Sequence, residues 1–325
     1  MEKMANVEIS VIVVAKDITD ALPTLLTCFE QQSMPTARYE LILVSYGEAQ
    51  PDAMARIAKC LTGASISVKH YHEPSSSEVK AKNVGARKAS GALLLFLDPD
   101  LLAGPELLER HVEIHATTGK PVIAFGQSAP HSALPGGLLT RWFVKQDHAL
   151  MNVEKPESLY TLSSRHCSLS RGLFLEEKGF PEDFEAMRAA DILLMRKLIE
   201  KRCVPLRLPG VQAFIWRASN FDEECARHYR EGYDLARLAF LLDDPELLKN
   251  FGLQCSSFRY WLAELYMPFY VRTCRSHTLD MRVHGHSCRR VLVYERHRGA
   301  RAAHHRYGSG RNEVLRWSGK TTVEE

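Results

Sequence analysis

Features that would place a protein in a class at first sight are scarce in this sequence. Its 325 residues include no run of 18 consecutive apolar residues, which argues against a helix that spans a membrane. The eight cysteines lie far apart and form no Cys-x-x-Cys pair, so the sequence predicts neither a zinc ribbon nor a disulfide framework. Residues 1–8 have no apolar run behind a basic cluster, and we therefore expect no signal peptide and a cytoplasmic protein.

An excess of charge of one sign is also missing, because 42 lysines and arginines stand against 39 aspartates and glutamates. The net charge of +3 decides nothing about nucleic acid, and 45% hydrophobic and 25% charged residues are typical of a globular protein. The charge is nevertheless unevenly placed. Residues 272–320 hold 12 lysines and arginines against three acidic residues, a net +9, which leaves −6 for the remainder.

Short aliphatic runs alternate with helix-like segments over the first third of the chain. The predicted strands are 7–14, 39–44, 65–71 and 92–97, and the predicted helices are 20–32, 52–61, 78–90 and 105–118. The runs 7–14 and 39–44 are apolar on both faces, as buried parallel strands are. Such an order predicts an α/β fold with a parallel sheet between helices, which binds ligands at the carboxyl ends of its strands.

The pattern weakens beyond residue 126. Prolines and glycines in 126–162 indicate loops over a site rather than further strands, and 188–201 is predicted to be a helix. Residues 233–272 look like two helices, and the basic, histidine-rich tail after them has no convincing hydrophobic period. We expect two parts, a main domain over 1–232 and a helical extension with a basic tail over 233–325.

In the segment 81–100, Lys82-Asn83-Val84-Gly85 and Ala89-Ser90-Gly91 precede an apolar strand and Asp98-Pro99-Asp100. This segment resembles the core of family 2 glycosyltransferases of the GT-A fold. In that family an (R/K)-N-x-G helix and an A-x-G turn lead into a strand that ends in D-x-D. The family's first β-α-β unit matches the strand 9–14, the helix end 30–33 and the strand 39–44. Its acceptor-side elements resemble residues 171–180 and 190–204. The resemblance covers about residues 7–232.

The resemblance implies a donor site for a nucleoside-diphosphate sugar, a UDP-sugar in the first place, with a divalent cation, Mn²⁺ or Mg²⁺. Asp98 and Asp100 would bind the metal, Asp100 more directly and Asp98 towards the ribose. Lys82 and Asn83 would reach the nucleotide from their helix, and Asp17 would lie near the base. Simpler interpretations remain open: a proline-containing turn with solvated acids for D-x-D, an exposed helix face for Lys82, and a loop cap for Asp17.

Inversion at the anomeric carbon requires a general base that takes the proton of the acceptor hydroxyl. The family supplies it from a Glu-Asp pair at the start of the helix after a Gly-Phe loop. Here Gly179 and Phe180 are followed by Ala190 and Asp191, so Asp191 is the candidate catalytic base. The alternative is an aspartate that the helix dipole favours near a helix N-terminus.

Three positions depart from the family pattern. Ser45 occupies the place of an aspartate that contacts the nucleotide, Ala190 replaces the glutamate of the acidic pair, and Trp216 lies near the place of a metal-site histidine. A tryptophan cannot ligate a metal. These departures support a second hypothesis, a catalytically inactive GT-A protein that acts as a binding or scaffold partner.

The partners that we expect follow from the same resemblance and from the tail. The acceptor would carry a hydroxyl group on a glycan, a lipid-linked glycan or a small molecule, and the enzyme would transfer a hexose-like sugar. No aromatic RNA-binding motif accompanies the tail's arginines, so we expect no nucleic-acid partner, but a peripheral membrane contact. Residues 258–274 mix aromatics with flanking arginines, which fits either an interfacial helix or a helix packed over the catalytic domain by its aromatic side.

Overall fold

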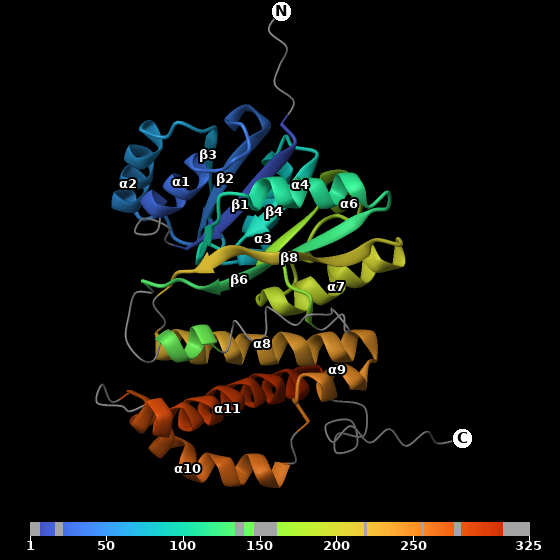
Figure 1. Cartoon of the computed structure of the whole chain (residues 1–325). Coiled ribbons are helices and arrows are strands. Elements are labelled where there is room, and N and C mark those ends of the chain that lie inside the picture. Colours follow the sequence, from blue (N-terminus) through green and yellow to red (C-terminus); the bar gives the residue numbers. More distant parts are fainter. Residues whose placement is uncertain are drawn as a thin grey trace, which may run out of the picture. The chain divides into compact units, whose positions relative to one another are not determined.

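The computed structural model describes residues 7–16, 22–133, 140–145, 161–217, 220–254, 257–275 and 281–307. Contacts within the chain divide it into two compact units (Figure 1). The first unit comprises Met1–Leu134, Val144–Asp183 and Ala190–Arg217, and the second comprises Pro135–Phe143, Phe184–Ala189 and Ala218–Glu325. The expected boundary at residue 232 therefore falls inside the second unit, within the helix Phe221–Leu242.

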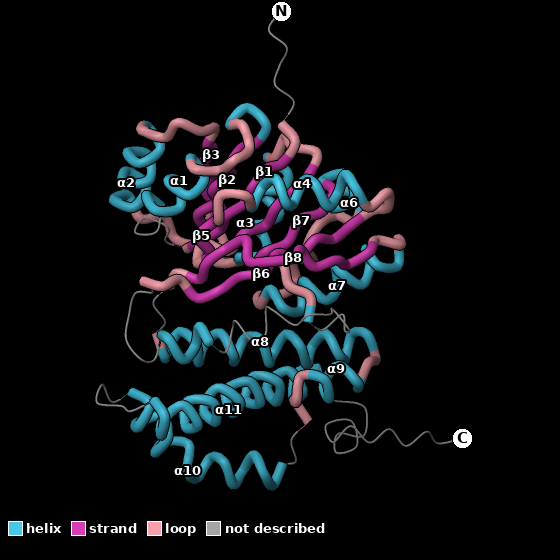
Figure 2. Tube along the Cα trace, viewed as in Figure 1, coloured by secondary structure: helices cyan, strands magenta, loops and turns pink. Residues whose placement is uncertain are grey.

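The first unit is built on a mixed sheet. Its strands are β1 (Ile9–Ala15), β2 (Tyr39–Tyr46), β3 (Val68–Glu73), β4 (Leu93–Leu97), β5 (Leu101–Ala103), β6 (Val122–Pro130), β7 (His166–Ser170) and β8 (Val204–Ile215). Within the described residues they follow the order β3-β2-β1-β4-β7-β6-β8-β5 (Figure 2). The first four strands are parallel, β7 is antiparallel to both of its neighbours, and β5 is antiparallel to β8.

The predicted parallel strands and the helices between them are confirmed. The helices are α1 (Leu22–Glu30), α2 (Pro51–Thr62), α3 (Glu78–Lys88) and α4 (Leu107–Thr117), followed by α6 (Arg171–Glu176) and α7 (Met187–Glu200). All seven residues of β1 are buried, because helices cover both faces of the sheet, and its sequence therefore shows no polar alternation. Gly85 lets α3 approach closely, since a Cβ there would lie 2.6 Å from the Ile12 side chain.

The two faces of the sheet have different cores. On one face α1, α2 and α4 pack on Val11 of β1 and on Leu95 of β4. On the other face Phe96 of β4 packs against Phe174 and Phe180, with ring centroids 5.2–5.3 Å apart. Side chains alternate along a strand, so Asp98, the residue after Leu97, lies on the same face as Phe96, which is the face that α3 covers.

The expectation of loops over 126–162 is wrong at its start, because β6 continues to Pro130. Gly126 lies inside that strand, and a Cβ there would overlap the imidazole of His166. The glycine thus marks a close approach between a strand and a buried ring, which from sequence resembles a loop signal. The strands β7 and β8 were likewise not predicted.

The second unit is helical, with α8 (Phe221–Leu242), α9 (Pro245–Asn250), α10 (Ser257–Arg275) and α11 (Met281–Tyr307). Residues 281–307, where the sequence shows no convincing hydrophobic period, nevertheless form one long helix. Glycines allow close packing of α11 on α8. A Cβ at Gly299 of α11 would overlap the carbonyl oxygen of Tyr229, and a Cβ at Gly232 of α8 would overlap the carbonyl oxygen of Arg296. A helix that packs through glycine and alanine has little hydrophobic contrast between its faces. None of the described helices is both long and apolar enough to cross a membrane.

Two buried histidines, His111 and His166, and the partly buried His115 form a hydrogen-bonded cluster between α4 and β7. Ser168 Oγ lies 2.7 Å from His111 Nδ1 and 2.8 Å from His115 Nε2, and His111 Nε2 lies 3.1 Å from His166 Nε2. Burial lowers the pKa of all three, to about 4 for His115 and about 3 for His166. The cluster is therefore neutral in the folded protein.

This cluster predicts that stability falls in mild acid. As the pH drops below about 6.5, these histidines become protonated in the unfolded chain but stay neutral in the folded protein. The free energy of unfolding therefore decreases. The His115 contribution to this decrease ends near pH 4, where the folded His115 titrates, and the His166 contribution continues to about pH 3. Urea midpoints measured at pH 7, 6 and 5 check this, and His115→Gln should show a shallower decline. Equal declines in both proteins would contradict it.

Candidate active site

Asp98 lies directly after β4, at the carboxyl end of a central strand. Its backbone N–H donates to the Arg165 carbonyl oxygen (2.8 Å), and Arg165 Nε donates to Asp98 Oδ2 (2.6 Å). The Nζ of Lys82 lies 3.6 Å from Asp98 Oδ1, on the other side of the carboxylate. Two cations thus hold Asp98, one from the residue before β7 and one from α3.

Lys82 is a fully buried cation. Its Nζ donates to Ser164 Oγ (3.2 Å) and lies 3.3 Å from Glu78 Oε1, one turn earlier on α3. Burial lowers the pKa of Lys82, but the carboxylates of Glu78, Asp98 and Asp191 outweigh burial and raise the pKa above its usual value. Lys82 therefore stays charged at neutral pH, and the open alternative of an exposed helix face is wrong.

Asp191 enters the same group of residues from α7. The backbone N–H of Ser164 donates to Asp191 Oδ2 (3.1 Å), while the Ser164 hydroxyl contacts Lys82. Ser164 and Asp191 are both buried. The structure thus brings the candidate base and the first aspartate of D-x-D together around one lysine.

Asp100 is the more accessible carboxylate of D-x-D, with about a third of its side chain exposed (34%). Arg217 Nη1 lies 3.5 Å from Asp100 Oδ2, and the Trp216 N–H donates to the Asp100 carbonyl oxygen (2.7 Å). Burial raises the pKa of Asp100, and the guanidinium groups of Arg217 and Arg165 oppose that rise. Trp216 thus lies beside the D-x-D turn, as its place in the sequence suggested.

Asn83 does not face an open site. It is buried, its Nδ2 donates to the Phe180 carbonyl oxygen (2.8 Å) and to Glu182 Oε1 (2.9 Å), and its Oδ1 accepts from the Phe180 N–H (2.9 Å). A Cβ at Gly179, which has φ 71°, would lie 2.5 Å from Asn83 Oδ1. These contacts show Asn83 fixing the loop before α7, and none of them supports the predicted nucleotide contact.

Ser45 lies one residue before the end of β2, where the nucleotide contact was expected. It is buried, and its hydroxyl lies 3.0 Å from His70 Nε2 and 3.0 Å from His72 Nδ1 on the neighbouring strand β3. A serine between two imidazoles thus stands where the family has a carboxylate. Asp17, the residue expected near the base, lies outside the described residues.

Three site residues were missed from sequence: Ser164, Arg165 and Arg217. Arg165 and Arg217 follow no periodic pattern, and their partners lie far away in the chain. Their one usable signal is position, since they flank the strands β7 and β8, and neither strand was predicted.

Comparison with family models places residues 10–174 in Glycosyl transferase family 2. The matched segment covers just over half of the chain, and it contains Lys82, Asp98 and Asp100. The chain belongs to glycosyl transferase family 2. Both Asp191 and Arg217 lie beyond the matched segment of this family 2 protein.

Solved structures share the fold of this family 2 protein at low sequence identity. TarS of S. aureus, residues 1–349 in complex with UDP, has 16% identity and a TM-score of 0.52, over 93% of this chain and 92% of that chain. The mannosyltransferase PcManGT from Pyrobaculum calidifontis, in complex with GDP-Man and Mn²⁺, has 15% identity and a TM-score of 0.58, over 93% and 88%. These likenesses confirm the predicted GT-A fold. A search of the curated proteins gave no match.

The family 2 site fits a divalent cation by its donor chemistry. Among the described residues, no three histidine, cysteine or carboxylate side chains form a complete metal site. A divalent cation that binds phosphates needs only one or two carboxylate ligands from the protein, because phosphate oxygens and waters complete its coordination shell. Asp100 is partly exposed, and Asp98 Oδ1 is a buried atom that accepts no hydrogen bond from the described residues. These two carboxylates suit that role.

Proposed function

We propose that this protein transfers a hexosyl group from a nucleoside-diphosphate sugar to a hydroxyl acceptor, with inversion at the anomeric carbon. One observation carries the proposal: Asp98, at the end of β4, and Asp191, on α7, lie around the same buried Lys82. The arrangement puts Asp98, a candidate carboxylate of the sugar-donor site, and Asp191, the candidate base, on two sides of one cation. UDP- and GDP-sugars are the first donors to test, since the TarS and PcManGT structures hold UDP, UDP-GlcNAc and GDP-Man.

In the proposed reaction the acceptor oxygen attacks the anomeric carbon, and the bond from that carbon to the β-phosphate oxygen breaks. The bonding electrons leave with the diphosphate, whose negative charge increases. Lys82, Arg165 and Arg217 lie beside the D-x-D carboxylates and are the cationic groups that would contact the diphosphate in this proposal. Asp98 and Asp100 would hold a divalent cation, which when bound would stabilise that leaving charge.

Asp191 takes the proton of the acceptor hydroxyl in this proposal. Ser164 fixes the orientation of its carboxylate, and Lys82 stabilises its charged form. Asn83 acts as a positioning residue, because it fixes the loop at Phe180 that leads into α7.

A panel of UDP-, GDP- and dTDP-sugars tests the donor assignment through thermal stability of the purified protein, with and without Mn²⁺. A bound ligand raises the melting temperature by mass action. We expect one nucleotide to raise the melting temperature, Mn²⁺ to enlarge the rise, and Asp100→Ala to abolish it. If no sugar nucleotide raises the melting temperature at millimolar concentration, the donor assignment is wrong.

A further inference from the structure

The helix α10 carries a row of large apolar side chains that are substantially exposed. Trp261, Leu262, Leu265 and Phe269 are 55%, 43%, 65% and 70% exposed. Their spacing places them along one face of the helix, since successive residues turn by about 100°. The opposite face of α10 packs on the rest of the second unit through Tyr260 and other buried residues.

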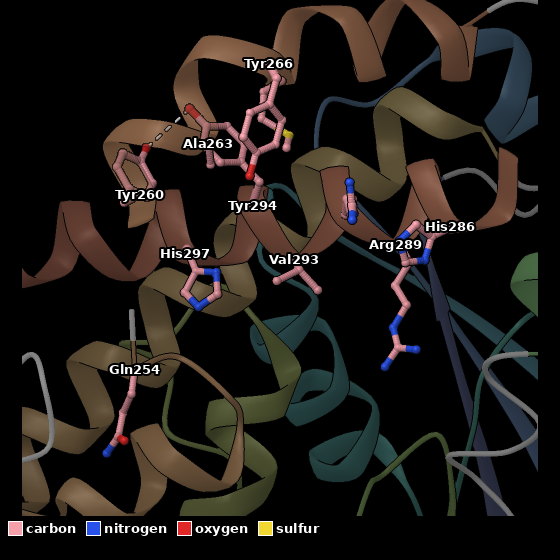
Figure 3. A pocket seen from close by; sticks show the side chains of 11 residues that line it. Gln254, Tyr260, Ala263, Tyr266, His286, Arg289, Val293, Tyr294 and His297 are labelled. Carbon is pink, nitrogen blue, oxygen red and sulfur yellow. Dashed lines mark hydrogen bonds between the residues drawn. The ribbon is translucent and has the colours of Figure 1, made fainter. Parts of the chain in front are cut away.

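A groove of about 470 Å³ lies between α10 and α11. Figure 3 shows Tyr266 of α10 on one side of it and His286, Arg289 and Val293 of α11 on the other. The groove combines aromatic walls with guanidinium and imidazole groups. Such a lining suits a ligand with an apolar part and an anionic part.

The charge of these two helices is strongly positive, with ten arginines against two glutamates. Some arginines are used internally, as Arg296 is by Glu231 and Arg298 is by Glu295. Within the described part of the chain, the exposed Arg272 and Arg289 pair with no carboxylate. A second copy of this chain would bring the same positive helices against each other, so charge disfavours a symmetric dimer through this face.

We propose that α10 and α11 form a docking surface for an anionic lipid bilayer. The tryptophan, leucine and phenylalanine side chains of α10 enter the boundary between headgroups and acyl chains, where such residues are favoured. Arg272 and Arg289 bind lipid phosphates, and the groove accommodates a headgroup. The inference is independent of the proposed glycosyl transfer, because every residue that it uses lies in the second unit.

Co-sedimentation of the full chain with vesicles tests the proposal. Vesicles of phosphatidylcholine with 30% phosphatidylglycerol are compared with pure phosphatidylcholine, at low and high salt. The first variant, Leu265→Ser with Phe269→Ser, removes apolar contact, and the second, Arg272→Glu with Arg289→Glu, reverses charge. Leu241→Ser is the matched control, since Leu241 is 63% exposed on α8 of the same unit. Circular dichroism confirms that each variant is folded.

We expect the wild type and Leu241→Ser to bind anionic vesicles at least tenfold more tightly than neutral ones, with weaker binding at high salt. Both α10 and α11 variants should lose at least tenfold in affinity. The proposal is overturned if the wild type does not sediment with anionic vesicles, or if the folded variants bind like the wild type. Light scattering that shows a wild-type dimer, converted to a monomer by Leu265→Ser with Phe269→Ser, would assign the face to a second copy instead.

Discussion

The substitution Asp191→Asn is expected to lower kcat by about 10²- to 10⁴-fold while the donor binds as in the wild type, since general-base catalysis contributes this much. Asparagine keeps an oxygen that can accept from the Ser164 N–H, so the local structure should persist. It cannot take a proton from the acceptor hydroxyl. The measurement is nucleoside-diphosphate release under donor saturation, with donor affinity from calorimetry.

The control for this prediction is Asp52→Asn, which removes a carboxylate from the exposed first turn of α2. It should leave kcat unchanged. If Asp191→Asn turns over at the wild-type rate, Asp191 serves only the hydrogen bond to Ser164, and the base lies elsewhere. If the wild type binds the donor and never turns over, the inactive binding protein that Ala190 and Trp216 suggest is the better account.

Lys82→Met is expected to reduce the free energy of unfolding of the first unit by about 3–5 kcal/mol, the usual cost of removing one partner from a buried ion pair. Among the described residues, methionine leaves Arg165 as the one cation in contact with Asp98, and it removes the donor to Ser164. Donor binding should fall as well, because a cation beside the diphosphate is lost. Chemical denaturation measures the first effect.

The matched control is Lys80→Met, two residues earlier on the same helix, where the side chain is only partly buried. It should change the stability by less than about 0.5 kcal/mol, as surface substitutions usually do. The double variant Lys82→Met with Asp98→Asn should recover part of the lost stability, since it removes the carboxylate that the lysine neutralises. Equal stabilities of the Lys80 and Lys82 variants would contradict the role of a buried cation.

The parallel half of the sheet could be predicted from sequence because its residues follow local rules. β1 and β2 are buried on both faces and read as continuous aliphatic runs. α3 follows the N-cap residue Ser77, whose hydroxyl accepts from the Lys80 N–H. The turn after β4 holds Asp98 and Asp100, so the site could be located at the carboxyl end of that strand before any coordinates.

The antiparallel half and the cationic residues could not be predicted, because their signals are not local. A side chain at position 126 would overlap the ring of His166, so a glycine is required there. Arg165 belongs to the site because it binds Asp98, which lies far earlier in the chain. The helix α11 packs through glycine and alanine, so its sequence has no strong hydrophobic period. Asn83 shows a related limit: the motif located the residue, but its contacts with Phe180 became visible only in the fold.

The proposed function requires that the residues around Asp98 and Asp100 recognise the diphosphate of a sugar nucleotide. Isothermal titration calorimetry with UDP against UMP, and GDP against GMP, in the presence of Mn²⁺, measures this recognition. The account predicts that one diphosphate binds at least tenfold more tightly than its monophosphate, and that Asp100→Asn removes the difference. Equal affinities for diphosphate and monophosphate, or no binding of either pair, would contradict it.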